Sequence, residues 1–499
     1  MRSVCRGCHG GCGVLLTVDE GRLTDVAGDP DSPFNRGAIC VKGKAAPEIV
    51  YHPDRLRHPL KRKGDRGSGR WQQISWDKAL DEISERLGEI RLESGPETVA
   101  IGQGTGRHHY LHVVRFANCF GTPNWYEPGL AQCFHPRITV SNLTYGALPV
   151  GDYLGEVSPR TILFWGHNPL ISGPDGELSF PIRRTLAKGS VYGIAVDPRR
   201  SETARRCKLW LPIRPGTDAA LALAMIHVII SEQLHDTDFV ADWCVGFKEL
   251  ARHVEKRTPG WASKITGVPP QDIAQAARVY ATRKPGILDW GVGLEQNANS
   301  TQTVRAVAIL RAITGNIDVP GGDILGMGLL GGYPVHREHL PRGIAGKRLG
   351  RDFSLLGGSW ALMPSAHIPA LVQAMLDGEP YRVRALLLLG SNPLVTVADG
   401  PRFGRALDRL DLLVAVDLFM TPSAERADYV LPAAYWPEID QVVGMPFVAH
   451  NAILFQRKCV DVPECRPDEW ILDELARRLE LPGADERVDD CLNQTLQQS

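Results

Sequence analysis

The chain has 499 residues, of which 43% are hydrophobic, so it can bury more than one core and we expect two or three domains. Lys and Arg (56) nearly balance Asp and Glu (57), and the net charge of -1 favours neither nucleic acid nor an anionic membrane as a partner. No apolar run approaches the roughly 18 residues of a membrane span, and Cys5 leaves no room for a signal peptide, so the sequence predicts a cytoplasmic protein.

Four of the eleven cysteines stand near the N-terminus, at positions 5, 8, 12 and 40. Cys5, Cys8 and Cys12 are separated by glycine-rich spacers and can wrap one face of a compact cluster, while Cys40 arrives from a distant loop. Zinc is the alternative, but its usual layout is two separated pairs of ligands. The triplet followed by a single cysteine therefore favours a [4Fe-4S] cluster.

The first 60 residues lack a long apolar run, so we expect that this segment needs a metal staple to fold. From Trp76 to Leu92, apolar residues recur at intervals of three and four, which predicts an amphipathic helix with Ser75 as its N-cap. Beyond it, short apolar runs alternate with helical patterns, which predicts mostly parallel sheets covered by helices. The predicted strands are Thr98 to Ile101, Thr161 to Trp165, Val191 to Val196, Gly286 to Trp290, Ala385 to Leu389 and Leu412 to Val416.

Two segments of the chain repeat one pattern. Each has an apolar strand followed by Gly-x-Asn-Pro-Leu, beginning at Gly166 or Gly390, and a second strand that ends in Asp197 or Asp417. In both copies an alanine stands 7 residues after the aspartate and a proline 15 residues after it. The repeat predicts two equivalent α/β units and two equivalent ligands.

These loops are suited to nucleotides. Open parallel sheets bind nucleotides where strands end, and glycine there lets phosphate approach the backbone. The carboxylate of Asp197 or Asp417 can accept two hydrogen bonds from the edge of a guanine. Taken singly, Asn-Pro and Asp-Pro are ordinary turn dipeptides. Because the offsets match in two copies, the pattern favours two guanine nucleotide sites.

Further motifs extend over nearly the whole chain. They are Arg36-Gly-Ala-Ile-Cys40-Val-Lys42-Gly43, Tyr51-His-Pro-Asp-Arg-Leu56, Gly166-x-Asn168-Pro169, Pro215-Gly-Thr-Asp218, Gly291-Val-Gly-Leu-Glu-Gln-Asn297, Gly390-Ser-Asn-Pro393 and Asp468-Glu-Trp470. Together with the cysteines they resemble the molybdopterin oxidoreductases, the family of formate dehydrogenase and dimethyl sulfoxide reductase.

The resemblance implies a [4Fe-4S] cluster and a molybdenum or tungsten ion held between two molybdopterin guanine dinucleotides (bis-MGD). It places one dinucleotide on Gly166, Asn168, Asp197, Pro215 and Asp218, and the other on Gly390, Asn392, Asp417 and Thr421, with Gly293 and Gln296 as further contacts. Lys42 resembles the lysine that couples cluster and pterin in electron transfer. Alternatively, Lys42 is an exposed base whose charge stabilises the thiolates.

The metal of most family members takes one ligand from the protein, and a soft thiolate suits molybdenum or tungsten. By resemblance this ligand is Cys133. Cys119 is the competitor, but it stands where a helix is predicted to end and is better explained as a buried apolar thiol.

Three residues bear on the substrate. His135 comes one position later than the histidine of formate dehydrogenases, which weakens a formate assignment, and Arg305 stands where those enzymes keep a substrate-orienting arginine. A structural role on a helix is the alternative for Arg305. Residues 302–322 are most similar to the acetylene hydratase branch, which uses an aspartate directly after its second cluster cysteine; here His9 takes that position and offers an imidazole for proton transfer.

We therefore expect an α/β protein with a cluster domain at residues 1–58, two interleaved Rossmann-like domains within 59–465 and a helical tail at 466–499. One α/β domain would combine about 59–128 with 308–440, and the other would be 129–307. The C-terminal β-barrel that caps both dinucleotides in the family is expected to be absent or supplied by another polypeptide.

Three functions stay open at this point. The first is a two-electron oxidoreductase that acts on a small molecule and passes electrons through the cluster to a redox partner protein. The second is a hydratase that resembles acetylene hydratase. The third is a truncated or cofactor-poor subunit that needs a partner to supply the cap. The complete set of cluster cysteines and Lys42 favour the first.

Overall fold

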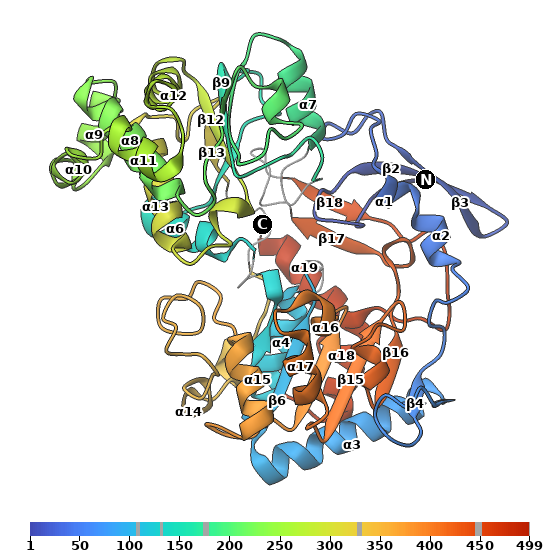
Figure 1. The fold of residues 1–499 in the computed structure, drawn as a ribbon. Helices are drawn as coiled ribbons and strands as arrows, with labels where there is room; N and C mark the ends of the chain where they lie inside the picture. The colour runs from blue at the N-terminus through green and yellow to red at the C-terminus, as the bar shows by residue number, and fades with distance from the viewer. Residues whose placement is uncertain (106–109, 130–132, 173–178, 327–331, 445–451, 499) are drawn as a thin grey trace.

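The computed structural model describes residues 1–499 apart from 106–109, 130–132, 173–178, 327–331, 445–451 and 499. Figure 1 shows a small N-terminal domain beside two α/β bodies, one built on a four-stranded sheet and one on a seven-stranded sheet. No helix within the described ranges is long and apolar enough to cross a lipid bilayer.

The N-terminal domain is a three-stranded antiparallel sheet followed by two short helices. Its elements are β1 (Arg2–Val4), β2 (Gly13–Asp19), β3 (Arg22–Gly28), α1 (Val41–Lys44) and α2 (Ala46–Val50). Val14 and Leu16 of β2 are buried, as are Leu23 and Val26 of β3, so one face of the sheet forms a small core. A hairpin from the far end of the chain, β17 (Gln441–Gly444) and β18 (Ile453–Gln456), lies beside this sheet (Figure 1).

The four-stranded sheet is parallel throughout. Its order is β11 (Leu209–Leu211), β10 (Tyr192–Val196), β9 (Thr161–Trp165) and β12 (Gly286–Trp290). Leu163 and Trp165 face a large cluster with the helices on one side, whereas Ile162 and Phe164 face the opposite side, as the two-residue period of a strand requires. The larger cluster includes α8 (Asp218–Ser231), α11 (Pro259–Thr266), α12 (Pro270–Thr282) and α13 (Ser300–Ile313); α7 (Ser179–Ala187) covers the other face.

The seven-stranded sheet has the order β5 (Trp71–Gln73), β4 (Leu60–Arg62), β16 (Tyr429–Pro432), β15 (Leu412–Asp417), β14 (Ala385–Leu389), β6 (Val99–Gln103) and β7 (Trp125–Tyr126). β4 pairs antiparallel with both β5 and β16 at one edge, and the pairs from β16 to β7 are parallel. One face packs against α3 (Trp76–Ser94), α4 (Tyr110–Phe120) and α18 (Asp468–Arg478), and the other against α15 (Ile368–Asp377) and α17 (Gly400–Leu407).

Shorter elements complete the chain. They are α6 (His135–Tyr145), β8 (Pro149–Gly151) paired with β13 (Asp323–Leu325), α9 (Thr237–Trp243), α10 (Phe247–Val254), α14 (Arg342–Ala345), α16 (Pro393–Thr396), α19 (Val488–Gln498) and the 3-10 helices η1 (Pro96–Thr98), η2 (Ala204–Arg206), η3 (Val292–Leu294), η4 (Arg337–His339), η5 (Ala424–Arg426) and η6 (Trp436–Glu438).

The predicted α/β class with mostly parallel sheets is confirmed, and the six predicted strands correspond to β6, β9, β10, β12, β14 and β15. The predicted helix is α3, and the Ser75 hydroxyl accepts a hydrogen bond from the backbone N–H of Lys78 at 3.2 Å, as an N-cap does. The domain boundaries stay predictions.

Candidate cofactor and active site

The four N-terminal cysteines converge on one place. Cys5, Cys8 and Cys12 lie on the loop between β1 and β2, which is closed by a hydrogen bond from the N–H of Cys5 to the carbonyl of Cys12 at 2.8 Å. Cys40 immediately precedes α1. A Cβ placed on Gly43 in α1 would lie 3.2 Å from the Cys5 sulfur, so a glycine there lets α1 pack closely against the loop.

The electrostatics of this group fit a bound iron cluster. Burial, together with the neighbouring cysteine thiols, raises the pKa of Cys5 to about 11 and that of Cys12 to about 12. Four thiolates therefore need compensating cations, which iron would supply. A tetrahedral zinc ion, with Zn–S bonds of about 2.3 Å, would hold its sulfurs about 3.8 Å apart. Within the described residues, no three of these cysteines have sulfur atoms that all lie within 4.8 Å of one another. The sulfur atoms are therefore spread more widely than a single zinc ion would hold them.

Cys133 and Cys119 have different environments. Cys133 is half-buried, directly precedes Phe134, the N-cap of α6, and donates its N–H to the carbonyl of Gly129 at 3.1 Å. Cys119 lies near the end of α4, is 5% exposed, and has its pKa raised to about 11 by burial. This contrast agrees with the predicted choice of Cys133 as metal ligand, which stays a prediction.

The cluster loop and the Cys133 loop are joined through one residue, Thr105. The Nε2 of His9 lies 2.6 Å from the carbonyl oxygen of Thr105, which follows β6. A Cβ on Gly129 would lie 3.1 Å from the Thr105 methyl group, and the carbonyl of Gly129 accepts hydrogen bonds from Cys133 and from Phe134. The predicted cluster and the predicted metal ligand are thus neighbours through this short series of contacts.

The two repeated units have the same geometry where their first strands end. Gly166 (φ +60) and Gly390 (φ +52) both adopt the left-handed conformation that favours glycine. The N–H of each donates across to the next strand, to Val196 at 2.9 Å and to Val416 at 2.8 Å. The strand orders β11-β10-β9-β12 and β16-β15-β14-β6 also correspond. The repeat inferred from the sequence is therefore present in three dimensions.

The two asparagines fix the loops rather than project freely. The side-chain oxygen of Asn168 accepts from the N–H and hydroxyl of Thr203 at 3.1 and 2.7 Å. That of Asn392 accepts from the N–H and hydroxyl of Ser423 at 3.3 and 2.7 Å. Asn168 also donates to Glu202 at 2.8 Å. Each asparagine therefore holds the glycine turn against the loop that follows the second strand.

The predicted guanine-binding carboxylates also stand at matched positions. Asp197 accepts the N–H of Arg199 at 2.8 Å, and Asp417 accepts that of Leu418 at 2.7 Å. Burial raises the pKa of Asp417. Asp218, the first residue of α8, accepts from the indole of Trp165 at 2.9 Å, and burial raises its pKa as well.

The remaining predicted cofactor contacts lie on the same loops. Pro215 is exposed just before α8, and Gly293 in η3 donates its N–H to the carbonyl of Gly166 at 3.3 Å. Gln296 is exposed two residues after the end of η3. The hydroxyl of Thr421 accepts the N–H of Ala424 at 3.2 Å. Their roles in binding a dinucleotide stay predictions.

The predicted substrate and electron-transfer residues differ in exposure. His135 begins α6 and is 9% exposed; burial lowers its pKa, so the neutral imidazole is favoured. Arg305 is on an exposed face of α13, and Lys42 is exposed on α1. Their predicted roles are not tested by this geometry.

Two buried ion pairs near the site were missed in the sequence. His167, between Gly166 and Asn168, pairs through Nδ1 with Asp289 of β12, and Tyr153 donates its hydroxyl to the same carboxylate. Arg137 of α6 donates to Glu295 from its backbone N–H at 3.2 Å and from Nε and Nη2 at 3.1 Å. A charged residue within an apolar strand, as in Gly286–Trp290, is the signal that points to such a partner.

The carboxyl edge of the seven-stranded sheet also has unused hydrogen-bonding capacity. Gln103 ends β6 beside the Gly390 loop and is 0% exposed. Among the described residues neither its amide nitrogen nor its amide oxygen has a hydrogen-bond partner. A polar ligand at this edge would satisfy such a group, so the residues present fit a dinucleotide.

Comparison with known proteins agrees with this geometry. Residues 1–52 match the molybdopterin oxidoreductase Fe4S4 domain, and residues 55–478 match the molybdopterin oxidoreductase domain. The chain is 34% identical to acetylene hydratase of Syntrophotalea acetylenica and 31% identical to formate dehydrogenase H of Escherichia coli, each over 96% of this chain and 68% of the relative.

A solved structure of acetylene hydratase from Pelobacter acetylenicus superimposes with a TM-score of 0.89 at 31% identity, over 99% of this chain and 72% of that one. The chain thus spans about two thirds of the length of the relatives it matches. It belongs to the molybdopterin oxidoreductase family, whose two domains here assign to it a [4Fe-4S] cluster and molybdopterin with molybdenum or tungsten.

Proposed function

We propose that the chain is a molybdenum- or tungsten-dependent oxidoreductase that carries out two-electron chemistry on a small substrate at a metal ligated by Cys133. The observation that supports it most is the series of contacts from His9 through Thr105 and Gly129 to Cys133. It leaves a short distance between the cluster loop and the metal-ligand loop, as electron transfer between two centres needs.

In this proposal the chain's residues bind and orient. The two glycine loops hold one dinucleotide each, with Asp197 and Asp417 accepting from the guanine edges. When bound, the pterin metal centre supplies two-electron chemistry and the cluster carries single electrons. Lys42 lies next to the cluster loop and would place a positive charge near the cluster; Arg305 would orient an anionic substrate.

The polar side chains near Cys133 set how protons can move. His135, kept neutral by burial, offers one donor and one acceptor nitrogen. The Arg137–Glu295 pair fixes the first turn of α6, which begins two residues after Cys133, and would help to preorganise the metal-ligand loop.

Electrons would leave at the surface near the cluster. Val41, directly after Cys40, is 79% exposed, and Lys42 and Lys44 flank it. We infer that a small iron–sulfur protein with an acidic rim docks there.

A hydratase activity is the second candidate. Similarity to acetylene hydratase extends over 96% of the chain. His9 takes the position of the hydratase aspartate, and because a carbonyl can only accept, its Nε2 donates to Thr105.

The test compares Cys133→Ser with Cys119→Ser in anaerobically purified protein. We expect X-ray absorption at the molybdenum or tungsten edge to lose one sulfur from the first coordination sphere in Cys133→Ser only, with iron content unchanged in both. Equal effects of the two substitutions would contradict the assignment.

The two candidate functions separate in one further assay. With formate as trial substrate and an electron-accepting dye, an oxidoreductase reduces the dye, whereas a hydratase converts acetylene without any change in the dye. Acetylene turnover in the absence of every redox activity would contradict the proposed function.

A further inference from the structure

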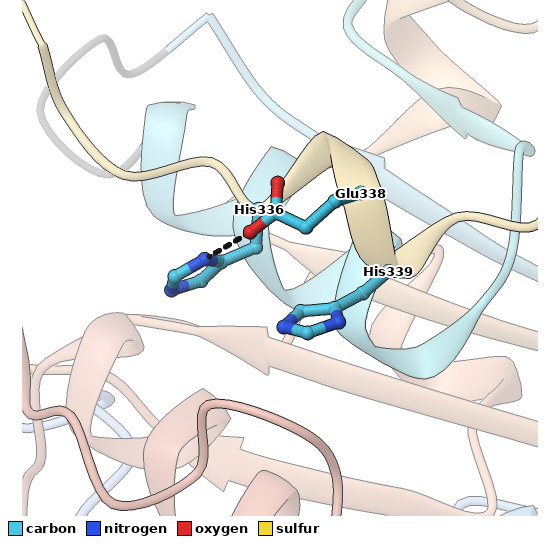
Figure 2. A group of neighbouring side chains, drawn as sticks. All are labelled: His336, Glu338 and His339. Atoms are coloured by element: carbon cyan, nitrogen blue, oxygen red, sulfur yellow. Dashed lines mark hydrogen bonds and ion pairs between the residues drawn. The ribbon is translucent and has the colours of Figure 1, made fainter.

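A group of metal-binding side chains lies on the turn at residues 336–339, on a segment separate from the cysteine loops. Figure 2 shows the side chains of His336, Glu338 and His339 gathered on one side of η4. One ring nitrogen of each histidine and one oxygen of the carboxylate lie within 4.8 Å of one another. His336 has a φ of +50, a conformation that a non-glycine residue keeps only when its surroundings fix it.

Both ring nitrogens of His336 face carboxylate oxygens. Its Nδ1 lies 3.0 Å from Oε1 of Glu338, and its Nε2 lies 2.8 Å from Oε2 of Glu486. Carboxylates only accept, and a neutral imidazole donates from one nitrogen alone. One contact therefore requires either a charged imidazolium or a cation in place of the second proton.

Glu486 determines which nitrogen is available. Arg115 donates to its Oε2 at 3.3 Å and to its backbone carbonyl at 3.1 Å, so the carboxylate is held toward Nε2 of His336. A histidine whose one nitrogen donates to a carboxylate presents the other nitrogen as a lone pair, which is the usual support of a metal ligand. Nδ1, facing Glu338, is then the ligand atom.

We propose that Nδ1 of His336, the carboxylate of Glu338 and a ring nitrogen of His339 bind a divalent metal ion of the zinc class. Two imidazoles and a carboxylate suit Zn²⁺ and leave a fourth position for water. With metal bonds of about 2.0–2.2 Å in tetrahedral geometry, the nitrogen and oxygen would stand about 3.4 Å apart. From the present 3.0 Å this needs only a small movement of the exposed Glu338 side chain.

The site joins parts of the chain that are distant in sequence. Glu486 lies between α18 and α19, and Arg115 of α4 also donates to the carbonyl of Gly483 at 2.6 Å. The hydrogen bonds of Glu486 already fasten this turn to α4 and to the segment that leads into α19, so a metal ion would bind a turn held in place. It is distinct in place and in ligand type from the cluster cysteines and from Cys133.

The test measures Zn²⁺ binding by the full chain with its iron cluster in place, because empty cluster cysteines would themselves bind zinc. Competition with a chromogenic chelator gives the affinity and the number of zinc ions per chain. We expect one ion per wild-type chain, an affinity at least about a hundredfold weaker in His339→Ala and Glu338→Gln, and one about tenfold weaker in Glu486→Gln. The control is His253→Ala, which removes an exposed histidine on α10 and should leave binding unchanged.

Iron content and melting temperature show whether each variant is folded and loaded. Zinc should raise the melting temperature of the wild type and of His253→Ala, because it binds the folded chain, but not that of His339→Ala. Wild-type affinity in both His339→Ala and Glu338→Gln would overturn the proposal by placing zinc elsewhere. Absence of micromolar binding by the wild type would overturn it as well.

Discussion

The two repeated α/β units share a backbone but differ in the charges around it. Gly166 is followed by His167, which pairs with buried Asp289, whereas Gly390 is followed by Ser391. In the first sheet Asp289 pairs with β9, the first strand of the repeat. In the second sheet Gly102 takes the matching place beside β14. The first glycine turn is thus surrounded by ionisable groups and the second by neutral ones.

The carboxylates of the two units differ as well. Asp197 is half-buried at the start of an exposed, basic loop. Asp417 has its pKa raised by burial and lies close to Asp468, whose own pKa burial raises to about 7. The repeated backbone therefore gives two loops of the same shape, while the neighbouring side chains make the two loops chemically unequal.

The largest expected effect tests whether the two aspartates bind their dinucleotides equally strongly, as the shared backbone predicts, despite their different neighbours. Asp197→Ala and Asp417→Ala should each cost about 2–3 kcal/mol of dinucleotide binding at their own site, because each removes a charge-assisted pair of hydrogen bonds. That corresponds to release roughly 30-fold or more readily. Guanine nucleotide counted per chain after acid hydrolysis is the measurement. Full guanine content in both variants would mean that the aspartates serve only as turn residues.

Substitution of the two glycines should have smaller effects, and these should differ between the two units. Alanine at either position must adopt a positive φ, at a cost of about 1 kcal/mol. A Cβ on Gly166 would in addition lie 3.1 Å from the Cα of Gly293, whereas a Cβ on Gly390 meets nothing within 4 Å. We expect Gly166→Ala to lower the free energy of unfolding by about 2 kcal/mol and Gly390→Ala by about 1 kcal/mol. Equal losses in denaturant titrations would show that the contact with Gly293 relaxes freely.

The smallest effect concerns Asp468, which has a carboxylate neighbour in the second unit. Its folded pKa of about 7 lies above the unfolded value of 3.8, so its contribution to stability is complete below pH 3.8 and is lost as pH rises toward 7. Between pH 5 and pH 6 the free energy of unfolding of the wild type should fall by about 1 kcal/mol because of this group. Asp468→Asn should abolish that part of the decrease in melting temperature, and the exposed Asp489→Asn should not. Parallel pH profiles for all three proteins would argue against a buried, protonated Asp468.

Much of the fold could be predicted because central parallel strands are apolar along their whole length. Thr161–Trp165, Gly286–Trp290 and Ala385–Leu389 are buried at every position, so their ends could be predicted to the residue. The N-terminal strands β2 and β3 are partly exposed and have few buried positions, so their apolar pattern was too weak to predict them. The edge strands β4 and β5 are mostly polar, and they were not predicted for the same reason.

The candidate site was predictable where its residues are close in sequence or repeated. The Gly-x-Asn loops and the cysteine triplet have local signals, and the structure places them as expected. The partnerships of His9 with Thr105 and of His167 with Asp289 join residues 96 and 122 positions apart. No local pattern specifies such a partner, because it depends on how the sheets are arranged.

The order of strands in the larger sheet has a consequence for synthesis of the chain. The four-stranded sheet uses residues 161–290 in one continuous stretch, whereas β6 of the seven-stranded sheet must wait for β14, about 290 residues later. At roughly 5–20 residues per second, that wait lasts about 15–60 seconds on the ribosome. The first repeated unit can thus fold while the second is still being made, so the two predicted halves of the cofactor site would become available one after the other.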